Sequence, residues 1–343
     1  ELIDEVILTC GKEKRLSLNE KCRLKKELFY ALRKMDMLQE LLEEHSITEI
    51  MVNGTEGIFL EREGRLYRWD KSFASEERIL DIVQQIAGAC NRTVNESQPI
   101  VDARLKNGDR VHIVLPPVAV NGPIITIRRF PDEPVTMQKL LELQSISEEE
   151  AEFLKHAVRA GYSILIAGGT GSGKTTFLNA LSEYIPEDER VVVIEDTSEL
   201  QIRTVPNLVR LETRSAGLED CREITVRDLI RASLRMRPSR IIVGEVRGGE
   251  AFELLTCLNT GHDGSISTCH ANSTRDTISR LETMSLMGME LPLQAIRRQI
   301  ASGIDLIVYL GRLRDKTRRL LEITEVTGME GDQVGLNPLF LFR

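Results

Sequence analysis

The sequence lacks long apolar runs and contains few aromatic side chains. Its uninterrupted apolar segments are only long enough for strands, so none can span a bilayer, and the N-terminal residues lack the apolar stretch of a signal peptide. Aromatic residues make up 4% of the 343 residues, and Trp69 is the single tryptophan. We therefore expect a protein that is cytoplasmic or peripheral to a membrane.

Paired cysteines and an excess of positive charge are also lacking. No two cysteines form a C-x-x-C pair, which argues against a zinc knuckle or a disulfide framework and favours reduced thiols. The 45 basic side chains are outnumbered by 53 acidic ones, for a net charge of −8, so no overall field attracts a nucleic-acid backbone. No nucleic-acid partner is expected. The cysteines are Cys10, Cys22, Cys90, Cys221, Cys257 and Cys269.

The length and the composition are those of an ordinary globular protein. With 41% apolar and 29% charged residues, the chain is long enough for roughly two domains, each with a core of its own. Four segments are predicted. They are an N-terminal helical segment (1–44), an α+β domain (45–130), a linker (131–139) and a larger domain (140–343).

An amphipathic helix is predicted within the first segment. Ser17 and Glu20 have the spacing of a capping box, and apolar residues then recur every three or four positions. Such a helix can pack on a partner or on its own domain, and the pattern leaves both open. The apolar residues are Leu24, Leu28, Leu32, Met35, Leu38 and Leu41.

Short alternating runs joined by turns follow between residues 47 and 130. Strands are predicted around 50–52, 58–60, 101–105, 111–115 and 124–127, with tight turns such as Asn53-Gly54 and Asn107-Gly108. A helix is predicted over 75–88 with Ser75 as its N-cap. These elements indicate a small α+β domain, and the two prolines of 131–134 suit a linker.

The most informative stretch is a glycine-rich turn, 168–175, between a predicted strand and a predicted helix. Its pattern, G-x-x-x-x-G-K-[ST], needs glycines because the backbone must curl tightly enough to aim several N–H groups at one phosphate. We predict that Lys174 contacts the β- and γ-phosphates of a nucleotide and that the Thr175 hydroxyl binds Mg²⁺. The predicted nucleotide-binding residues are Gly169, Thr170, Gly171, Ser172, Gly173, Lys174, Thr175 and Thr176.

Acidic residues end two further strand-like runs. The run 191–194 is followed by Glu195, and the run 240–243 is followed by Gly244 and Glu245. Ligands of open α/β sheets bind beyond the carboxyl ends of the strands, so carboxylates there suit an Mg-nucleotide site. We predict Thr175, Glu195 and Glu245 as metal-binding residues.

Two histidines, His262 and His270, bracket a predicted strand downstream. Histidines beside phosphate-binding loops can sense a phosphate, and they can also bind a metal ion. We favour phosphate sensing.

Four ordered motifs resemble those of the type II/IV secretion ATPases. The segments 168–175, 193–201, 242–250 and 262–273 resemble the Walker A motif, Asp box, Walker B motif and His box of that family. In the first domain, Asp102-Ala103-Arg104, Arg110-Val111-His112, Leu115-Pro116-Pro117 and Ile127-Arg128-Arg129-Phe130 look like the CpaF-type members that power tight-adherence (Tad) pili. The resemblance extends from about residue 45 to about residue 310.

The resemblance implies an α/β fold in which a smaller α+β N-terminal domain precedes a RecA-like P-loop NTPase motor domain. It implies a homo-hexameric ring that binds ATP and Mg²⁺ and uses hydrolysis to move its domains against inner-membrane platform proteins. The implied function is Tad or type IV-like pilus assembly or secretion, at the cytoplasmic face of the cell membrane. A type IV secretion traffic ATPase and a retraction motor are the alternatives.

The resemblance also implies catalytic roles. Gly244 occupies the usual Walker B aspartate position, as it does across this family, so metal and water duties fall on Glu245, Glu195 and Glu199, without a division between them. Glu245 is our choice for polarising the water, and His270 for reporting the γ-phosphate. The tetracysteine zinc module of type II secretion motors is missing, which favours the CpaF and type IV secretion branches. Candidate phosphate contacts from the first domain are Arg104, Arg110, Arg128 and Arg129, and weaker candidates are Arg203, Arg210 and Arg247.

Two other classes of protein remain as alternatives. A nucleic-acid motor would share the phosphate loop but should carry a basic track or stacking aromatics. A nucleotide switch that does not hydrolyse ATP would keep Lys174 but would not need Glu245.

Overall fold

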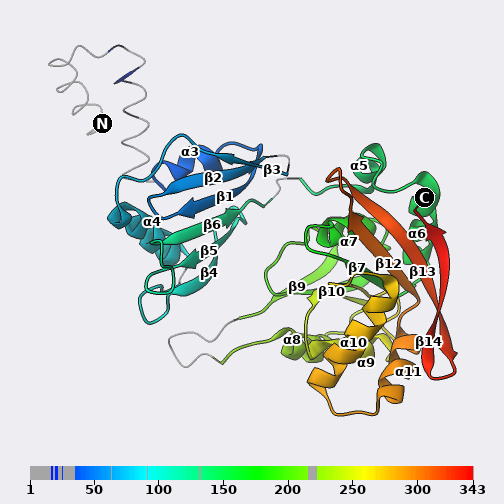
Figure 1. Ribbon diagram of the computed structural model, residues 1–343. Coiled ribbons are helices and arrows are strands. Elements are labelled where there is room, and N and C mark those ends of the chain that lie inside the picture. The colour runs from blue at the N-terminus through cyan, green and yellow to red at the C-terminus, as the bar shows by residue number, and fades with distance from the viewer. Residues whose placement is uncertain are drawn as a thin grey trace. The chain divides into compact units, whose positions relative to one another are not determined.

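The structure is a computed structural model, and it describes residues 17, 20, 21, 25, 35–62, 64–90, 92–130, 133–214 and 222–342. The chain divides into two compact units, Glu1–Asp132 and Glu133–Arg343 (Figure 1). Over the described ranges, no helix has both the length and the apolar character that a membrane span requires.

The predicted capping box near the N-terminus is present. The Ser17 N–H donates to Glu20 Oε2 at 2.7 Å, and the Glu20 N–H donates to Ser17 Oγ at 3.3 Å. Helix α3 (Leu38–Leu42) begins only after a turn in which Asp36 has a φ of 49°. The predicted helix is therefore not continuous as far as Leu41, because a left-handed residue ends helical hydrogen bonding. Its predicted positions Leu24, Leu28 and Leu32 lie outside the described residues.

The first unit is built on an antiparallel sheet with the strand order β3-β2-β1-β6-β5-β4. Apolar residues alternate along these strands and bury one face against α4 (Glu76–Ala89) and α3, while polar residues occupy the other face. Ser75 is the N-cap of α4, as predicted. The strands are β1 (Ile47–Asn53), β2 (Gly57–Arg62), β3 (Arg65–Arg68), β4 (Ile100–Arg104), β5 (Arg110–Val114) and β6 (Ile124–Arg128).

The second unit is built on a larger mixed sheet with the strand order β14-β13-β12-β7-β11-β10-β8-β9. The strands from β12 to β9 run parallel, and β13 and β14 add an antiparallel edge. The strands are β7 (Ile164–Gly168), β8 (Arg190–Glu195), β9 (Asn207–Glu212), β10 (Arg240–Val246), β11 (Ile266–Cys269), β12 (Leu306–Arg312), β13 (Arg318–Glu330) and β14 (Gln333–Leu341).

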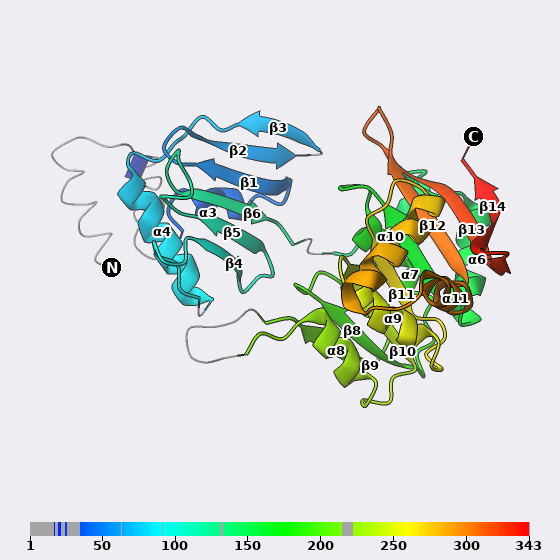
Figure 2. The same cartoon turned by 60° about the horizontal axis from the view of Figure 1, so that its bottom comes forward.

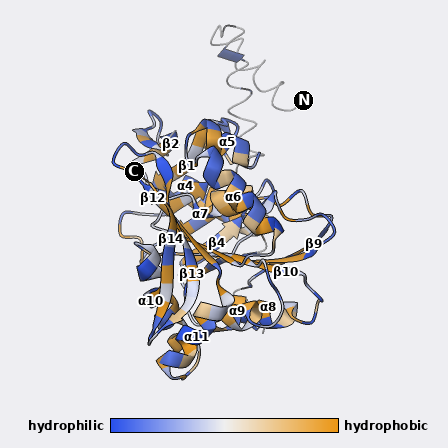
Figure 3. Cartoon of the chain, turned by 90° about the vertical axis from the view of Figure 1, so that its right-hand side faces the viewer, coloured by the Kyte–Doolittle hydropathy of each residue, from blue (hydrophilic) through white to orange (hydrophobic). Residues whose placement is uncertain are grey.

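Helices cover both faces of this larger sheet, which explains its continuous apolar strands. In β7, Ile164 and Ile166 join one core, while Leu165 and Ala167 join the core on the opposite face. Figure 2 shows α9 and α10 over the sheet, and Figure 3 shows apolar colour along β10. The helices are α5 (Met137–Glu142), α6 (Glu148–Arg159), α7 (Lys174–Ser182), α8 (Val226–Ser233), α9 (Glu250–Leu258), α10 (Thr274–Gly288) and α11 (Leu293–Gly303).

Local capping signals place the helices that precede the site. Ser147 and Glu150 form the predicted capping box of α6, and Gly161, with a φ of 82°, follows the end of that helix. Helix α5 begins at Met137, inside the segment predicted as linker, because the Thr136 hydroxyl accepts the Lys139 N–H at 3.2 Å and caps it.

Candidate active site

The phosphate-binding loop connects β7 to α7 at the carboxyl edge of the parallel sheet. Gly171 and Gly173 have φ values of 71° and 94°, a left-handed backbone that side chains disfavour. Gly173 is also the N-cap of α7 and brings no side chain to bond the first N–H groups. Those N–H groups and the positive end of the helix dipole are therefore available to an anion.

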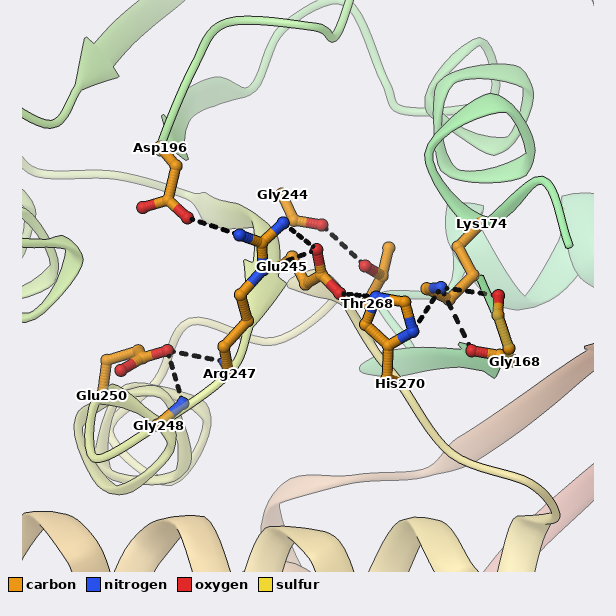
Figure 4. A network of polar contacts seen from close by, with 11 residues as sticks. Gly168, Lys174, Asp196, Gly244, Glu245, Arg247, Gly248, Glu250, Thr268 and His270 are labelled. Atoms are coloured by element: carbon orange, nitrogen blue, oxygen red, sulfur yellow. Dashed lines mark hydrogen bonds and ion pairs between the residues drawn. The ribbon is translucent and has the colours of Figure 1, made fainter. Parts of the chain in front are cut away.

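Lys174 lies across the mouth of this loop. Its Nζ donates to the carbonyl oxygens of Gly168 and Gly169, both at 3.1 Å, and lies 3.4 Å from His270 Nδ1 (Figure 4). Burial lowers the pKa of Lys174, although Glu245 opposes this effect. Phosphate oxygens would offer the ammonium group charged acceptors in place of the two neutral carbonyls.

Glu245, near the end of β10, lies between two basic side chains. Its Oε1 is 2.7 Å from His270 Nε2, and its Oε2 accepts from Arg247 Nε and Nη2 at 2.9 and 2.6 Å. Arg247 Nη1 lies 3.5 Å from Asp196. The structure thus brings Lys174, His270 and Glu245 together at one edge of the sheet. This follows because the carboxyl ends of neighbouring parallel strands lie at the same edge.

His270 connects the lysine to the carboxylate. Burial lowers its pKa; Glu245 opposes this shift, whereas Lys174 and Arg247 add to it. An ammonium group can only donate, so the contact of the ring with Lys174 suits the tautomer in which Nδ1 is the acceptor. Nε2 then faces Glu245 Oε1 at 2.7 Å.

Glu195, at the end of β8, is used differently from Glu245. It is 4% exposed, and its Oε1 accepts the N–H groups of Glu199 and Leu200 at 2.8 and 3.0 Å. Burial raises its pKa, and these two hydrogen bonds oppose the shift. A Cβ added at Gly244 would lie 3.0 Å from Glu195 Cγ, so a larger residue at this position would press on the packed glutamate.

The remaining polar groups of the loop suit a magnesium nucleotide. Thr175 lies in the first turn of α7 and is half-buried, while Ser172 Oγ is buried without a hydrogen-bond partner. Across the described part of the chain, no three His, Cys, Asp or Glu side chains form a metal site by themselves. A metal held by a hydroxyl, phosphate oxygens and water fits these residues, since Mg²⁺ in nucleotide sites keeps several waters.

His262 is not part of this edge. Its Nδ1 lies 3.2 Å from the Cys257 carbonyl and 3.5 Å from Thr260 Oγ1, at the amino end of β11. The strand between the two histidines separates them, and only His270 reaches the phosphate-loop edge. The geometry therefore supports the predicted phosphate sensing for His270, whereas the contacts of His262 lie away from the phosphate loop.

Three of the four predicted arginines of the first unit form a row. The strand register pairs Arg104 with Arg110 and Arg110 with Arg128, on the polar face of the sheet. Arg128 is 64% exposed and lies 3.7 Å from Glu49. Arg104 also donates to the Gly108 carbonyl at 3.2 Å.

Arg129 is directed into its own unit instead. Its side chain is 11% exposed, and Nη1 donates to the Glu44 carbonyl at 3.0 Å. Its Nε lies 3.2 Å from Asp109, which is itself buried. Successive strand residues point to opposite faces, which explains the contrast with Arg128.

The three weaker arginine candidates also differ in what they contact. Arg210 donates to the Leu200 carbonyl at 2.5 Å and Arg203 to Gln201 Oε1 at 2.9 Å, so both brace the segment after β8. Arg247 is the one of the three that contacts Glu245. Sequence reasoning missed Thr268, whose hydroxyl donates to the Gly244 carbonyl at 2.8 Å, because a threonine inside a strand carries no signal of such a contact.

These features define a P-loop nucleotide-binding domain of the RecA-like class, preceded by a smaller α+β domain. The residues 31–333 match the family model described as Type II/IV secretion system protein. The chain is 34% identical over 303 residues to the type IV secretion system protein VirB11 of Brucella suis, covering 80% of this chain and 84% of VirB11. The chain therefore belongs to the type II/IV secretion system ATPase family.

A second relative supports this placement, and a solved structure shows the same fold. The type IV secretion system protein PtlH of Bordetella pertussis is 32% identical over 315 residues, covering 84% of this chain and 93% of PtlH. The crystal structure of the pilus retraction motor PilT with bound ADP has a TM-score of 0.60 at 20% identity, covering 90% of this chain and 83% of PilT. The fold is thus that of the secretion and pilus motors.

Proposed function

We propose that this chain is the ATP-hydrolysing subunit of a homo-hexameric motor that drives a pilus or secretion machine from the cytoplasmic face of the membrane. The observation that carries the proposal is the row Lys174, His270, Glu245, which begins at the phosphate loop and ends on a carboxylate. A nucleotide switch needs the lysine but has no use for the carboxylate beyond it.

The chain's own residues divide the work as follows. Lys174 moves from the loop carbonyls to the β- and γ-phosphate oxygens, and the first N–H groups of α7 bind the phosphates. Glu245 accepts a hydrogen bond from the attacking water and orients it in line with the γ-phosphate. Mg²⁺, when bound, would neutralise negative charge on the phosphates. Of the predicted metal residues, Thr175 would hold its shell, whereas Glu195 Oε1 is engaged by two backbone N–H groups, so Glu199 would share the metal shell or the water with Glu245. Glu195 positions Glu199 through its backbone amide.

His270 reports the state of the phosphate. Because its Nδ1 contacts Lys174 and its Nε2 contacts Glu245, displacement of the lysine toward a phosphate frees one side of the ring. The His270 ring is then held less firmly, so the Glu245 carboxylate can turn from it toward water.

The arginine row of the first unit supplies positive charge. Arg104, Arg110 and Arg128 stand side by side, and Arg128, which is also in register with Glu49, is 64% exposed. We propose that Arg128 in particular contacts the γ-phosphate in a closed state of the ring, with residues 131–134 as the hinge.

The cellular role that we favour is Tad pilus assembly. The support is the CpaF-like pattern of the first unit, above all Asp102-Ala103-Arg104 and Ile127-Arg128-Arg129-Phe130. VirB11 and PtlH are named for type IV secretion, and PilT is a retraction motor, so a secretion ATPase or a retraction motor is the second candidate. The partners would be inner-membrane platform proteins.

The first experiment measures ATP binding and phosphate release for the parent and for Lys174→Ala. The parent should bind ATP and release phosphate in the presence of Mg²⁺, and the variant should lose most of its affinity because its buried ammonium group is gone. Turnover that is unaffected by DNA and RNA would exclude a nucleic-acid motor. Binding without any phosphate release would favour the switch instead.

The second experiment tests the ring. A site completed by a neighbouring subunit makes specific activity rise with protein concentration until assembly saturates. Sedimentation and turnover should therefore follow the same concentration dependence. A fully active monomer at high dilution would contradict the hexameric mechanism.

A further inference from the structure

The turn that joins β12 to β13 carries a dense group of cations beside the phosphate loop. Figure 2 shows this turn extending past the end of the sheet. Its single carboxylate, Asp315, is bonded by the Thr317 N–H and hydroxyl at 2.9 and 2.7 Å. Within the described ranges, no ion pair engages Arg312, Arg314 or Arg318. The basic residues of the turn and of the two strand ends beside it are Arg312, Arg314, Lys316, Arg318 and Arg319.

Two of these cations approach the phosphate loop itself. Arg318 Nε donates to the Gly171 carbonyl at 2.9 Å, and its Cδ would lie 3.4 Å from a Cβ added at Gly173. Arg312 Nη1 would lie 3.9 Å from a Cβ added at Gly171. Both guanidinium groups are exposed, so both can exchange these neighbours for a ligand.

The strand order indicates which end of a nucleotide they would meet. The Lys174, His270 and Glu245 row lies on the side of β7 where β11 and β10 follow, whereas β12 is the neighbour on its other side. A triphosphate whose terminal phosphate faces Glu245 therefore has its nucleoside end toward β12 and the turn beyond it.

We propose that Arg318, with support from Arg312, binds the nucleoside end of the nucleotide. This inference rests on the proposed ATPase function and names the residues that recognise the rest of the ligand. A planar guanidinium can stack on a purine ring and also donate to a ribose oxygen, which a lysine does less well. The ligand class is nucleoside di- and triphosphates, as opposed to inorganic polyphosphate.

The test compares Arg318→Ala with the matched control Arg314→Ala. Both remove one exposed cation from the same turn, but only Arg318 touches the phosphate loop. Dissociation constants are measured for ATP, ADP and inorganic tripolyphosphate. We expect Arg318→Ala to weaken ATP and ADP binding by about tenfold each and tripolyphosphate binding by less than about twofold. Arg314→Ala should leave all three within about twofold.

Two results would overturn the inference. An equal loss for tripolyphosphate and ATP would mean that Arg318 only shapes the loop through the Gly171 carbonyl. Unchanged ATP and ADP binding would mean that it makes no contact with the ligand. A parent protein that binds no ATP, or one whose ATP binding survives Lys174→Ala, would instead contradict the proposed function, so the two failures are distinguishable.

Discussion

The ends of β8 and β10 carry the same kind of residue and use it in opposite ways. At the end of β8, Glu195 is buried and accepts two backbone N–H groups from its own chain. At the end of β10, Glu245 lies between His270 and Arg247, both of which are ionisable. One carboxylate holds a loop in place, and the other is part of a row that can respond to a ligand.

The same contrast separates other pairs of residues that look alike. Arg129 donates to backbone carbonyls of its own unit, whereas Arg128 is exposed beside Arg110. His262 lies near a backbone carbonyl, whereas His270 lies between Lys174 and Glu245. A side chain held by backbone groups or in a buried ion pair stabilises the structure, and one that lies among other charged groups at an accessible edge is a candidate for chemistry.

The sharpest test of the contrast is Glu245→Gln beside Glu195→Gln. A glutamine at 245 cannot accept a proton from water, and general-base catalysis contributes about 10²–10⁴-fold to rates. We therefore expect turnover to fall by about 100-fold or more while ATP stays bound. A glutamine at 195 keeps an oxygen for the two N–H groups, so turnover should stay within about threefold.

Single-turnover phosphate release and equilibrium ATP binding, measured on both variants, decide the outcome. Parental turnover in Glu245→Gln would remove the water-polarising role from this residue. A comparable loss in both variants would return Glu195 to the catalytic group and erase the distinction between the two strand ends.

Arg128 and Arg129 show the same contrast between a structural and a catalytic role in the first unit. Arg129→Ala leaves buried Asp109 without its ion-pair partner, and breaking a buried pair costs about 3–5 kcal/mol. Arg128→Ala removes an exposed side chain and should leave thermal unfolding unchanged, yet lower the kcat of assembled particles by about tenfold. ATP affinity should change much less.

Both arginine variants must be assayed on particles that sedimentation shows to be assembled, because loss of the ring would imitate a catalytic defect. Unchanged turnover in assembled Arg128→Ala would mean that this strand contributes no arginine to the phosphates. Parental stability in Arg129→Ala would contradict its structural role.

Much of this fold and part of this site could be predicted from the sequence. The phosphate loop and the α6 capping box depend on neighbouring residues, so local patterns identify them. The roles of Glu195 and Glu245 depend on a loop that folds back and on the space at Gly244, which no local pattern records. The separation of the two histidines was predictable, because a strand between them places its ends on opposite edges of the sheet.

A third prediction concerns the loop that Glu195 holds. Glu195→Ala leaves the N–H groups of Glu199 and Leu200 without an acceptor in a buried position, which should lower the free energy of unfolding by about 1–3 kcal/mol. Glu195→Gln keeps the acceptor and serves as the matched control. Denaturant unfolding of both variants measures the difference, and equal stabilities would show that these hydrogen bonds contribute nothing.

The smallest effect expected is a pH dependence of stability that belongs to Glu195 alone. Burial raises its pKa above the ordinary value of 4.5, so the folded state keeps this proton to a higher pH than the unfolded chain does. Between the unfolded and folded pKa values the folded state binds more protons, and stability therefore falls as pH rises. One proton limits the slope to about 1.4 kcal/mol per pH unit. The free energy of unfolding of the parent relative to Glu195→Gln should decline from pH 4 toward neutrality. A flat difference would mean that the two amide hydrogen bonds fully compensate the burial of the charge.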